Sequence, residues 1–184
     1  MAILKIYTAP DPVLKRVAAP VDTVDDTIRK QMDDMLETMY HDDGIGLAAP
    51  QVGISNRIVV IDVEQKQGED KTGLNRKGNP MFFANPEIIW SSEECSVYNE
   101  GCLSVPELYG EVERPASVRV KYLDYDGKEQ EIAAEGLLAT CIQHEIDHLN
   151  GILFIDHLSA LKRNIILRKL KKLNKLNEAD PLPV

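Results

Sequence analysis

A short segment in the last quarter of the chain has the spacing of a metal-binding helix. His144 and His148 are four residues apart and Glu145 follows the first of them, so the segment reads H-E-x-x-H. Two residues at this spacing project from one helix face, where both imidazoles can bind a single metal ion. A bound metal brings water to a pKa of about 7, and a neighbouring carboxylate can accept the proton. The pattern therefore predicts metal-assisted hydrolysis.

The alternative for these residues is a core helix whose histidines only fill space. Burial of two histidines and a glutamate without a task is costly, because each polar group must then find a partner inside the protein. We therefore favour the metal site.

An open catalytic site needs a third protein ligand. Downstream of the helix the remaining histidine is His157. Upstream, Cys102 has a glycine before it and a proline four residues after it, which is typical of a sharply placed loop or strand end. A thiolate is a good ligand for such metals, so Cys102 with the two histidines completes a set that leaves one position for water or substrate. Considered alone, Cys102 would be a small buried hydrophobic residue.

Two helices are expected around this chemistry. Residues 137–149 are apolar on several faces and Gly151 follows, which predicts a mostly buried helix with a glycine stop. Residues 25–41 have apolar side chains at helical spacing, which predicts an amphipathic helix. Gly44 is expected to be the left-handed cap of that helix.

Strands are expected in the middle of the chain. Residues 57–63 are rich in Ile and Val and predict a buried strand. Residues 82–90 resemble a strand that Pro86 interrupts. The alternation after residue 117 and the turn signal Asp126-Gly127 predict a hairpin.

Length and composition indicate one domain that spans residues 1–184. The chain has 184 residues, of which 43% are hydrophobic and 28% charged. Its net charge of −9 gives DNA and anionic membranes no general attraction. Three cysteines cannot all pair, and the first residues do not resemble a targeting signal. We therefore expect a cytoplasmic protein with no DNA and no membrane partner.

The segment 158–177 predicts a basic C-terminal helix. Leucines and isoleucines recur at helical spacing, and seven of the chain's 21 basic residues lie between them. These are Lys162, Arg163, Arg168, Lys169, Lys171, Lys172 and Lys175. Such a helix either packs its leucines on the domain with a solvated charged face, or binds an anionic partner.

Three segments, in order along the chain, resemble the motifs of the peptide deformylase family. Residues 44–51 read GIGLAAPQ, residues 100–104 read EGCLS and residues 143–148 read QHEIDH. The resemblance covers about residues 3–161. It implies an α+β fold with small antiparallel β-sheets packed around a central metal-binding helix, to which the spacing in residues 158–177 adds a C-terminal amphipathic helix. It also implies removal of the formyl group from N-formylmethionine at the start of nascent polypeptides, which releases formate.

The resemblance implies a role for individual residues. Cys102, His144 and His148 correspond to the metal ligands, and Glu145 to the general acid and base. The side-chain amide of Gln51 and the backbone N–H of Leu103 correspond to the donors that hold the oxyanion. Residues expected to shape the substrate site are Ile45, Gly46, Glu100, Gly101 and Cys141. Some relatives have a basic residue where this chain has Tyr109.

The resemblance also implies a cofactor and partners. One divalent metal ion is expected, Fe²⁺ in the cell, while the same ligands accept Zn²⁺, Ni²⁺ or Co²⁺. The partners are N-formylmethionyl nascent peptides and, through the basic C-terminal helix, the ribosome. Other functions remain open: a generic H-E-x-x-H metallopeptidase, a Cys-dependent amidohydrolase with Cys102 as nucleophile, or a non-catalytic metal-binding or ribosome-associated protein.

Overall fold

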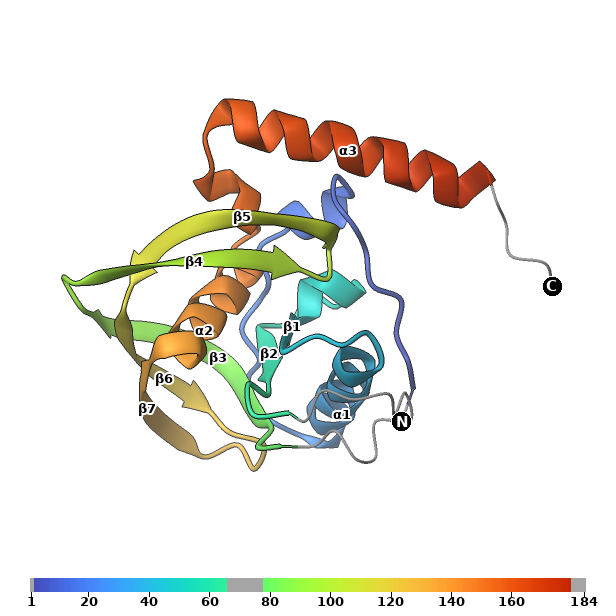
Figure 1. The fold of residues 1–184 in the computed structure, drawn as a ribbon. Coiled ribbons are helices and arrows are strands. Elements are labelled where there is room, and N and C mark those ends of the chain that lie inside the picture. Colours follow the sequence, from blue (N-terminus) through green and yellow to red (C-terminus); the bar gives the residue numbers. More distant parts are fainter. Residues whose placement is uncertain (1, 66–77, 180–184) are drawn as a thin grey trace.

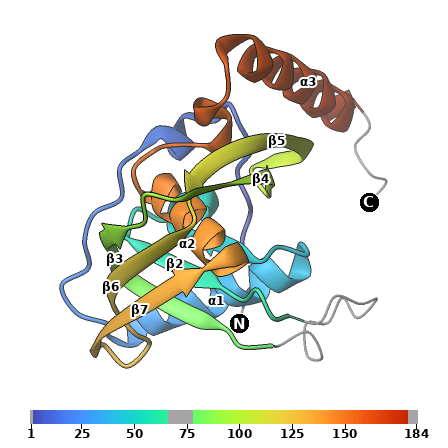
Figure 2. The same ribbon diagram turned by 60° about the vertical axis from the view of Figure 1, so that its left-hand side comes forward.

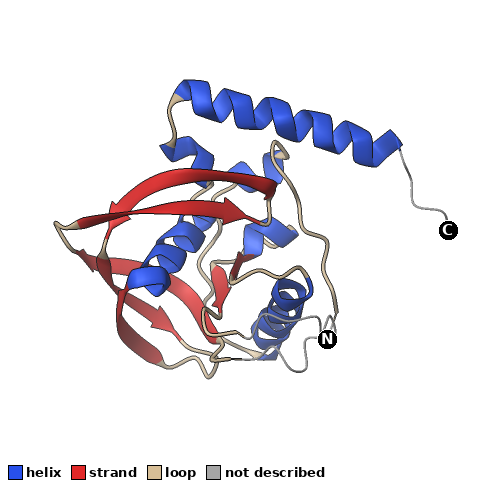
Figure 3. Cartoon of the chain, viewed as in Figure 1, coloured by secondary structure: helices blue, strands red, loops and turns tan. Residues whose placement is uncertain are grey.

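The computed structural model describes residues 2–65 and 78–179, which fold as a mixture of helices and antiparallel strands (Figures 1 and 3). The α-helices are α1 (Asp26–His41), α2 (Gly136–Leu149) and α3 (Ala160–Ala179). The strands are β1 (Gly46–Ala48), β2 (Ile58–Ile61), β3 (Met81–Ser91), β4 (Cys95–Cys102), β5 (Val105–Pro115), β6 (Ser117–Leu123) and β7 (Glu129–Glu135). Short 3₁₀ turns are η1 (Pro12–Lys15), η2 (Ala49–Val52) and η3 (Phe154–His157).

The strands form two antiparallel sheets around α2. Five strands pair in the order β1-β2-β3-β6-β7, while β4 and β5 form a separate two-stranded sheet. Figures 1 and 2 both place α2 between this hairpin and the larger sheet. The arrangement confirms the α+β class, with antiparallel sheets around a central helix.

Helix α1 forms where its apolar spacing predicts it, but its end differs from expectation. The Asp25 carboxylate accepts a hydrogen bond from the Ile28 backbone N–H at 2.9 Å and so caps the first turn. The left-handed residue after the helix is Asp43, with a φ of 60°, and not Gly44. Gly44 is needed for another reason, because a Cβ there would lie 2.6 Å from the Leu103 side chain.

The strands expected from the sequence in the middle of the chain are present in the structure, which also contains one hairpin that was not expected. Pro86 lies inside β3, where the pairing with β6 shifts register between Ala84 and Glu87, so a bulge accommodates the proline. The hairpin of β6 and β7 turns through Gly127, whose φ is 77°. The long hairpin of β4 and β5 has no counterpart in the predicted elements.

Helix α2 is buried along most of its length. Ten of its 14 residues are buried, and its apolar side chains contribute to a core formed with β2, β3, β6 and β7. Gly151 ends the segment with a φ of 74°. A Cβ at Gly151 would lie 2.5 Å from the Lys15 carbonyl oxygen, so only glycine fits this contact.

Helix α3 lies at the periphery and extends past the hairpin (Figure 1). Ile166 and Leu170 are buried in a cluster with Phe154 and Val112, whereas Leu176 is 66% exposed. None of the helices in the described residues has the length and apolar composition needed to cross a membrane.

Candidate active site

Cys102, His144 and His148 come together although they belong to different elements. Cys102 is the last residue of β4, and the two histidines lie one turn apart on α2. The ligand atoms of the three residues all lie within 4.8 Å of one another, and the Cys102 sulfur is 3.3 Å from Nε2 of His148. Among residues 2–65 and 78–179 this is the only such group of potential metal ligands. A soft thiolate with two imidazoles suits zinc, iron, cobalt or nickel.

A buried ion-pair network orients His144. Its Nδ1 lies 2.8 Å from Glu100 Oε1, so Nε2 remains for the ligand group. Arg114 donates to both oxygens of Glu100, through Nε at 2.7 Å and Nη2 at 3.0 Å. Its Nη1 donates to Asp147 at 2.9 Å. Such outer contacts fix the orientation of a metal-binding histidine.

The sequence interpretation did not identify Arg114 and Asp147. Asp147 occupies a variable position of H-E-x-x-H, and Arg114 lies on β5, which was not predicted. An acidic residue inside the motif was the available signal for Asp147. His157, considered as a third ligand, instead pairs with Asp147 at 2.8 Å.

Burial and neighbouring charges set the protonation of the network. Burial opposes the ionisation of Glu100, but hydrogen bonds from His144 and Arg114 lower the pKa of its carboxyl. Burial, together with the nearby charge of His144, holds the pKa of His148 well below its usual value. His148 is therefore neutral near pH 7, the form in which imidazole binds a metal.

Glu145 is the carboxylate of the site that has one oxygen without a hydrogen-bond donor. Its Oε2 is buried without a hydrogen-bond partner, an arrangement that requires a further group at this position. Burial raises the pKa of Glu145 to about 7. A carboxyl group with such a pKa both accepts and releases protons near neutral pH. The orphaned oxygen next to a thiolate-and-imidazole set fits a metal with its water.

Gln51 reaches the site from η2. It is 1% exposed, and its Oε1 accepts a hydrogen bond from the Ala48 N–H at 2.9 Å. That bond fixes the side-chain amide, so Nε2 points to Ser104 Oγ at 3.0 Å and to the Cys102 sulfur at 3.5 Å. Gln51 therefore presents an oriented donor beside the candidate metal ligand.

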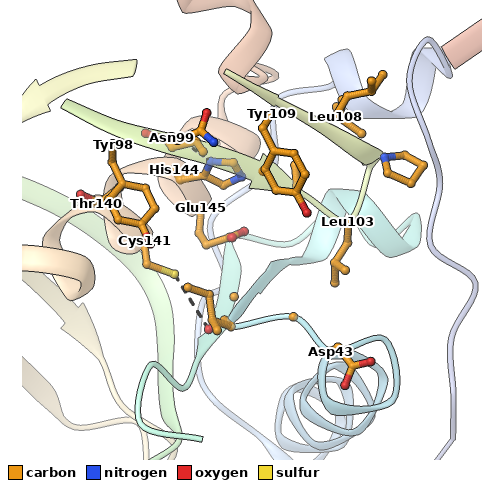
Figure 4. Close-up of a pocket in the computed structure, with 18 of the residues that line it drawn as sticks. Asp43, Tyr98, Asn99, Leu103, Leu108, Tyr109, Thr140, Cys141, His144 and Glu145 are labelled. Carbon is orange, nitrogen blue, oxygen red and sulfur yellow. Dashed lines mark hydrogen bonds and ion pairs between the residues drawn. The ribbon is translucent and has the colours of Figure 1, made fainter. Parts of the chain in front are cut away.

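A cavity of about 490 Å³ opens over these residues. Figure 4 shows Cys141, His144 and Glu145 of α2 on one side, with Tyr98 and Tyr109 of the hairpin beside them. The lining includes Gln51, Cys102, Leu103, His144 and Glu145, and also the five expected substrate residues Ile45, Gly46, Glu100, Gly101 and Cys141. His148 is not part of the lining.

Two of the three glycines that line the cavity, Gly46 and Gly101, lie close to other side chains of its lining. A Cβ at Gly46 would lie 2.6 Å from Glu145 Oε1 and 2.8 Å from the Cys141 sulfur. A Cβ at Gly101 would lie 2.6 Å from the Tyr109 ring. Both positions therefore keep the cavity narrow while leaving room for these side chains. Tyr98, Leu137 and Thr140 also line it and were not predicted.

A cysteine and two histidines beside a carboxylate at a cavity define a metal-dependent hydrolase. Comparison with known proteins narrows this class. A sequence model of the polypeptide deformylase family matches residues 3–164. The chain therefore belongs to the polypeptide deformylase family.

Individual relatives agree along almost the whole chain. The peptide deformylase of Rhizobium meliloti (strain 1021) is 55% identical over 182 residues, which cover 99% of this chain and 100% of that protein. The structure of a peptide deformylase from Legionella pneumophila has a TM-score of 0.86 at 46% identity, covering 99% and 100% of the two chains. That of Ehrlichia chaffeensis peptide deformylase in complex with actinonin has a TM-score of 0.84 at 46% identity, covering 94% and 98%. The expected fold class and enzyme family are confirmed.

Proposed function

We propose that this chain hydrolyses the formyl amide of N-formylmethionine at the start of nascent polypeptides, in the cytoplasm, and releases formate. The observation that carries the proposal is that the three family motifs, far apart in the sequence, converge on one narrow cavity with an oriented amide donor and a free carboxylate oxygen. Membership of the family supports the same reaction.

Cys102, His144 and His148 would hold one divalent metal ion, Fe²⁺ in the cell and Zn²⁺, Ni²⁺ or Co²⁺ in other preparations. Bound there, the metal supplies Lewis acidity and lowers the pKa of water. The Glu100–Arg114 pair keeps His144 oriented for this task, because Nδ1 of the ring is bonded to the carboxylate.

Glu145 moves the proton of the reaction. Its Oε2 accepts a proton from the attacking water and then passes it to the amine nitrogen that leaves. The pKa of about 7 suits both steps, because the group neither holds nor rejects the proton strongly at neutral pH.

Gln51 and Leu103 stabilise the charge that develops on the formyl oxygen. The Gln51 amide is held by Ala48, so its Nε2 is aimed before the substrate binds. One N–H of this amide donates to Ser104 Oγ at 3.0 Å, and the other faces the Cys102 sulfur at 3.5 Å, where it could turn to a substrate oxygen bound beside that sulfur. The Leu103 backbone N–H is the second donor, one residue after Cys102.

The cavity selects the substrate by size and by main-chain contact. Gly46 and Gly101 hold the walls close, so a formyl group fits and a larger acyl group is disfavoured. Ile45, Leu103 and Leu137 offer apolar surface for the methionine side chain. Strand β1 is an edge of the larger sheet, and an extended peptide can pair with it.

Formate release from an N-formylmethionyl tripeptide tests the reaction. Protein purified anaerobically should release formate, lose activity with a chelator and regain it with Fe²⁺. Actinonin, which is bound in the Ehrlichia chaffeensis relative, should inhibit it. Cleavage of the peptide bond instead would indicate a metallopeptidase. Activity that resists the chelator and is lost on thiol alkylation would indicate Cys102 as nucleophile.

The basic face of α3 is the proposed contact with the ribosome. Its seven basic residues lie on a helix that buries only Ile166 and Leu170 among residues 160–178, so most of its surface is accessible. Phosphate contacts by Lys and Arg weaken as salt rises. Truncation from Lys162 should abolish ribosome co-sedimentation at low salt. Unchanged co-sedimentation would assign ribosome contact elsewhere.

A further inference from the structure

Asp62 is a buried carboxylate that the proposed reaction does not use. It follows β2, has no exposed surface and does not line the cavity. Within residues 2–65 and 78–179, four donors surround its two oxygens: the Tyr40 hydroxyl at 2.6 Å and the backbone N–H groups of Gly78 at 2.9 Å, Glu64 at 3.1 Å and Asn79 at 3.1 Å. All of these donors are neutral, and hydrogen bonds of this kind to a carboxylate are stronger than those between neutral groups.

The donors of Asp62 come from separate parts of the chain. Tyr40 lies in the last turn of α1, whereas Glu64 and Gly78 stand on either side of the undescribed segment 66–77. The backbone at Glu64 and the backbone at Gly78 are in close contact, as shown by the 2.3 Å that would separate a Cβ at Gly78 from the Glu64 carbonyl oxygen. One buried side chain therefore connects the end of α1 to the backbone at residue 64 and to the backbone at residues 78–79.

The same residue holds the cavity wall through its main chain. The Asp62 N–H donates to the Ile45 carbonyl at 2.9 Å, and Gln65 Nε2 donates to the Gly44 carbonyl at 2.5 Å. Gly44 and Ile45 line the cavity. Across it, the Cys141 sulfur of α2 is 3.9 Å from the same Ile45 carbonyl, the contact drawn as a dashed line in Figure 4.

We propose that Asp62 is a positioning residue that fixes the 44–46 wall at the distance from α2 that peptide binding requires. It acts through Ile45 and Tyr40, and its hydrogen bonds within the described residues involve neither Glu145 nor the proposed metal ligands. The inference rests on the proposed function, since it concerns how tightly the formylated peptide binds. It places one determinant of peptide affinity outside the cavity, in addition to the residues that line it.

The test compares the KM and kcat of Asp62→Asn in the metal-loaded enzyme. The amide group that replaces one carboxylate oxygen points its own N–H donors at backbone N–H donors. The hydrogen bonds that hold Asp62 in place, and with it the 44–46 wall, are therefore weakened. We expect KM to rise about tenfold while kcat stays within about twofold, because the reacting groups stay in place. Tyr40→Phe removes one donor and should raise KM about threefold.

Asp124→Asn is the matched control. Asp124 also accepts two backbone N–H bonds, from Asp126 and Lys128, but in a hairpin turn remote from the cavity. It should cost stability without changing KM. An unchanged KM in folded Asp62→Asn, or in Tyr40→Phe where Asp62→Asn does not fold, overturns the proposal. Absence of formate release by the unaltered enzyme would instead overturn the proposed function.

Discussion

Helices α2 and α3 are both predicted from the sequence, but they differ in how much of each is buried in the protein. Ten of the 14 residues of α2 are buried, while α3 buries Ile166 and Leu170 among residues 160–178. In α2, packing and ion pairs constrain nearly every side chain. In α3 few side chains are buried, and the seven basic residues are exposed or half-buried. The difference indicates that substitutions in α2 would disturb the candidate active site. Substitutions in α3 would leave that site in place.

The largest effect is expected on α2, from Glu145→Gln. The amide keeps the shape but cannot accept the proton, so the rate of formate release should fall about 10²–10⁴-fold. Metal content, measured by atomic emission, should stay the same, since the proposed ligands are Cys102, His144 and His148. Glu129→Gln at the start of β7 is the control. Loss of the metal along with activity would contradict the assigned role.

Arg114→Met tests the network that supports the helix. The apolar side chain leaves Glu100 and Asp147 without their shared cation, and breaking a buried pair costs about 3–5 kcal/mol. Urea unfolding of the metal-loaded protein measures this loss. Arg119→Met removes an exposed pair with Glu131 and should cost about 0–1 kcal/mol. Equal losses from the two variants would show that burial does not govern the network.

Gln51→Ala examines a contribution to the site from outside α2. The variant loses one oxyanion donor, which should lower kcat about 10²–10³-fold, or about 2.7–4 kcal/mol in transition-state stabilisation. Gln130→Ala, on the exposed strand β7, serves as the control for formate-release kinetics. A rate near that of the unaltered enzyme would remove Gln51 from the mechanism.

A pair of leucine substitutions compares the two helices directly. Leu149→Ala at the end of α2 leaves a cavity at a fully buried position and should cost about 2–5 kcal/mol. Leu176→Ala on α3, where the side chain is 66% exposed, should change stability by less than about 0.5 kcal/mol. Thermal unfolding of both variants gives the comparison. A large loss from Leu176→Ala would mean that α3 packs more tightly than its exposure indicates.

The sequence predicted what depends on local spacing. The 137–149 helix, the hairpin at Gly127 and the strand before Asp62 follow from periodicity and turn residues within short windows. Gly44 shows the limit of this reasoning. A glycine after a helix suggests a left-handed cap, but here Asp43 has that conformation and Gly44 makes room for Leu103.

Contacts between distant segments were beyond such reasoning. Strand β5 carries glycine and two prolines and alternates poorly, so neither the strand nor the position of Arg114 was apparent. Arg114 has a function only because the fold brings Glu100 and Asp147 to it. The family motifs indicated the residues of the proposed metal site, and the structure added the charged side chains that surround them.

The division of the ligands between β4 and α2 has a thermodynamic consequence. A metal held by Cys102, His144 and His148 ties the small hairpin to the central helix and closes a loop from residue 102 to residue 144. Cross-links of this length lower the entropy of the unfolded chain, as a disulfide does. The ion that serves the reaction would thus also raise the free energy of unfolding. The supply of the metal would then set the fraction of molecules that stay folded.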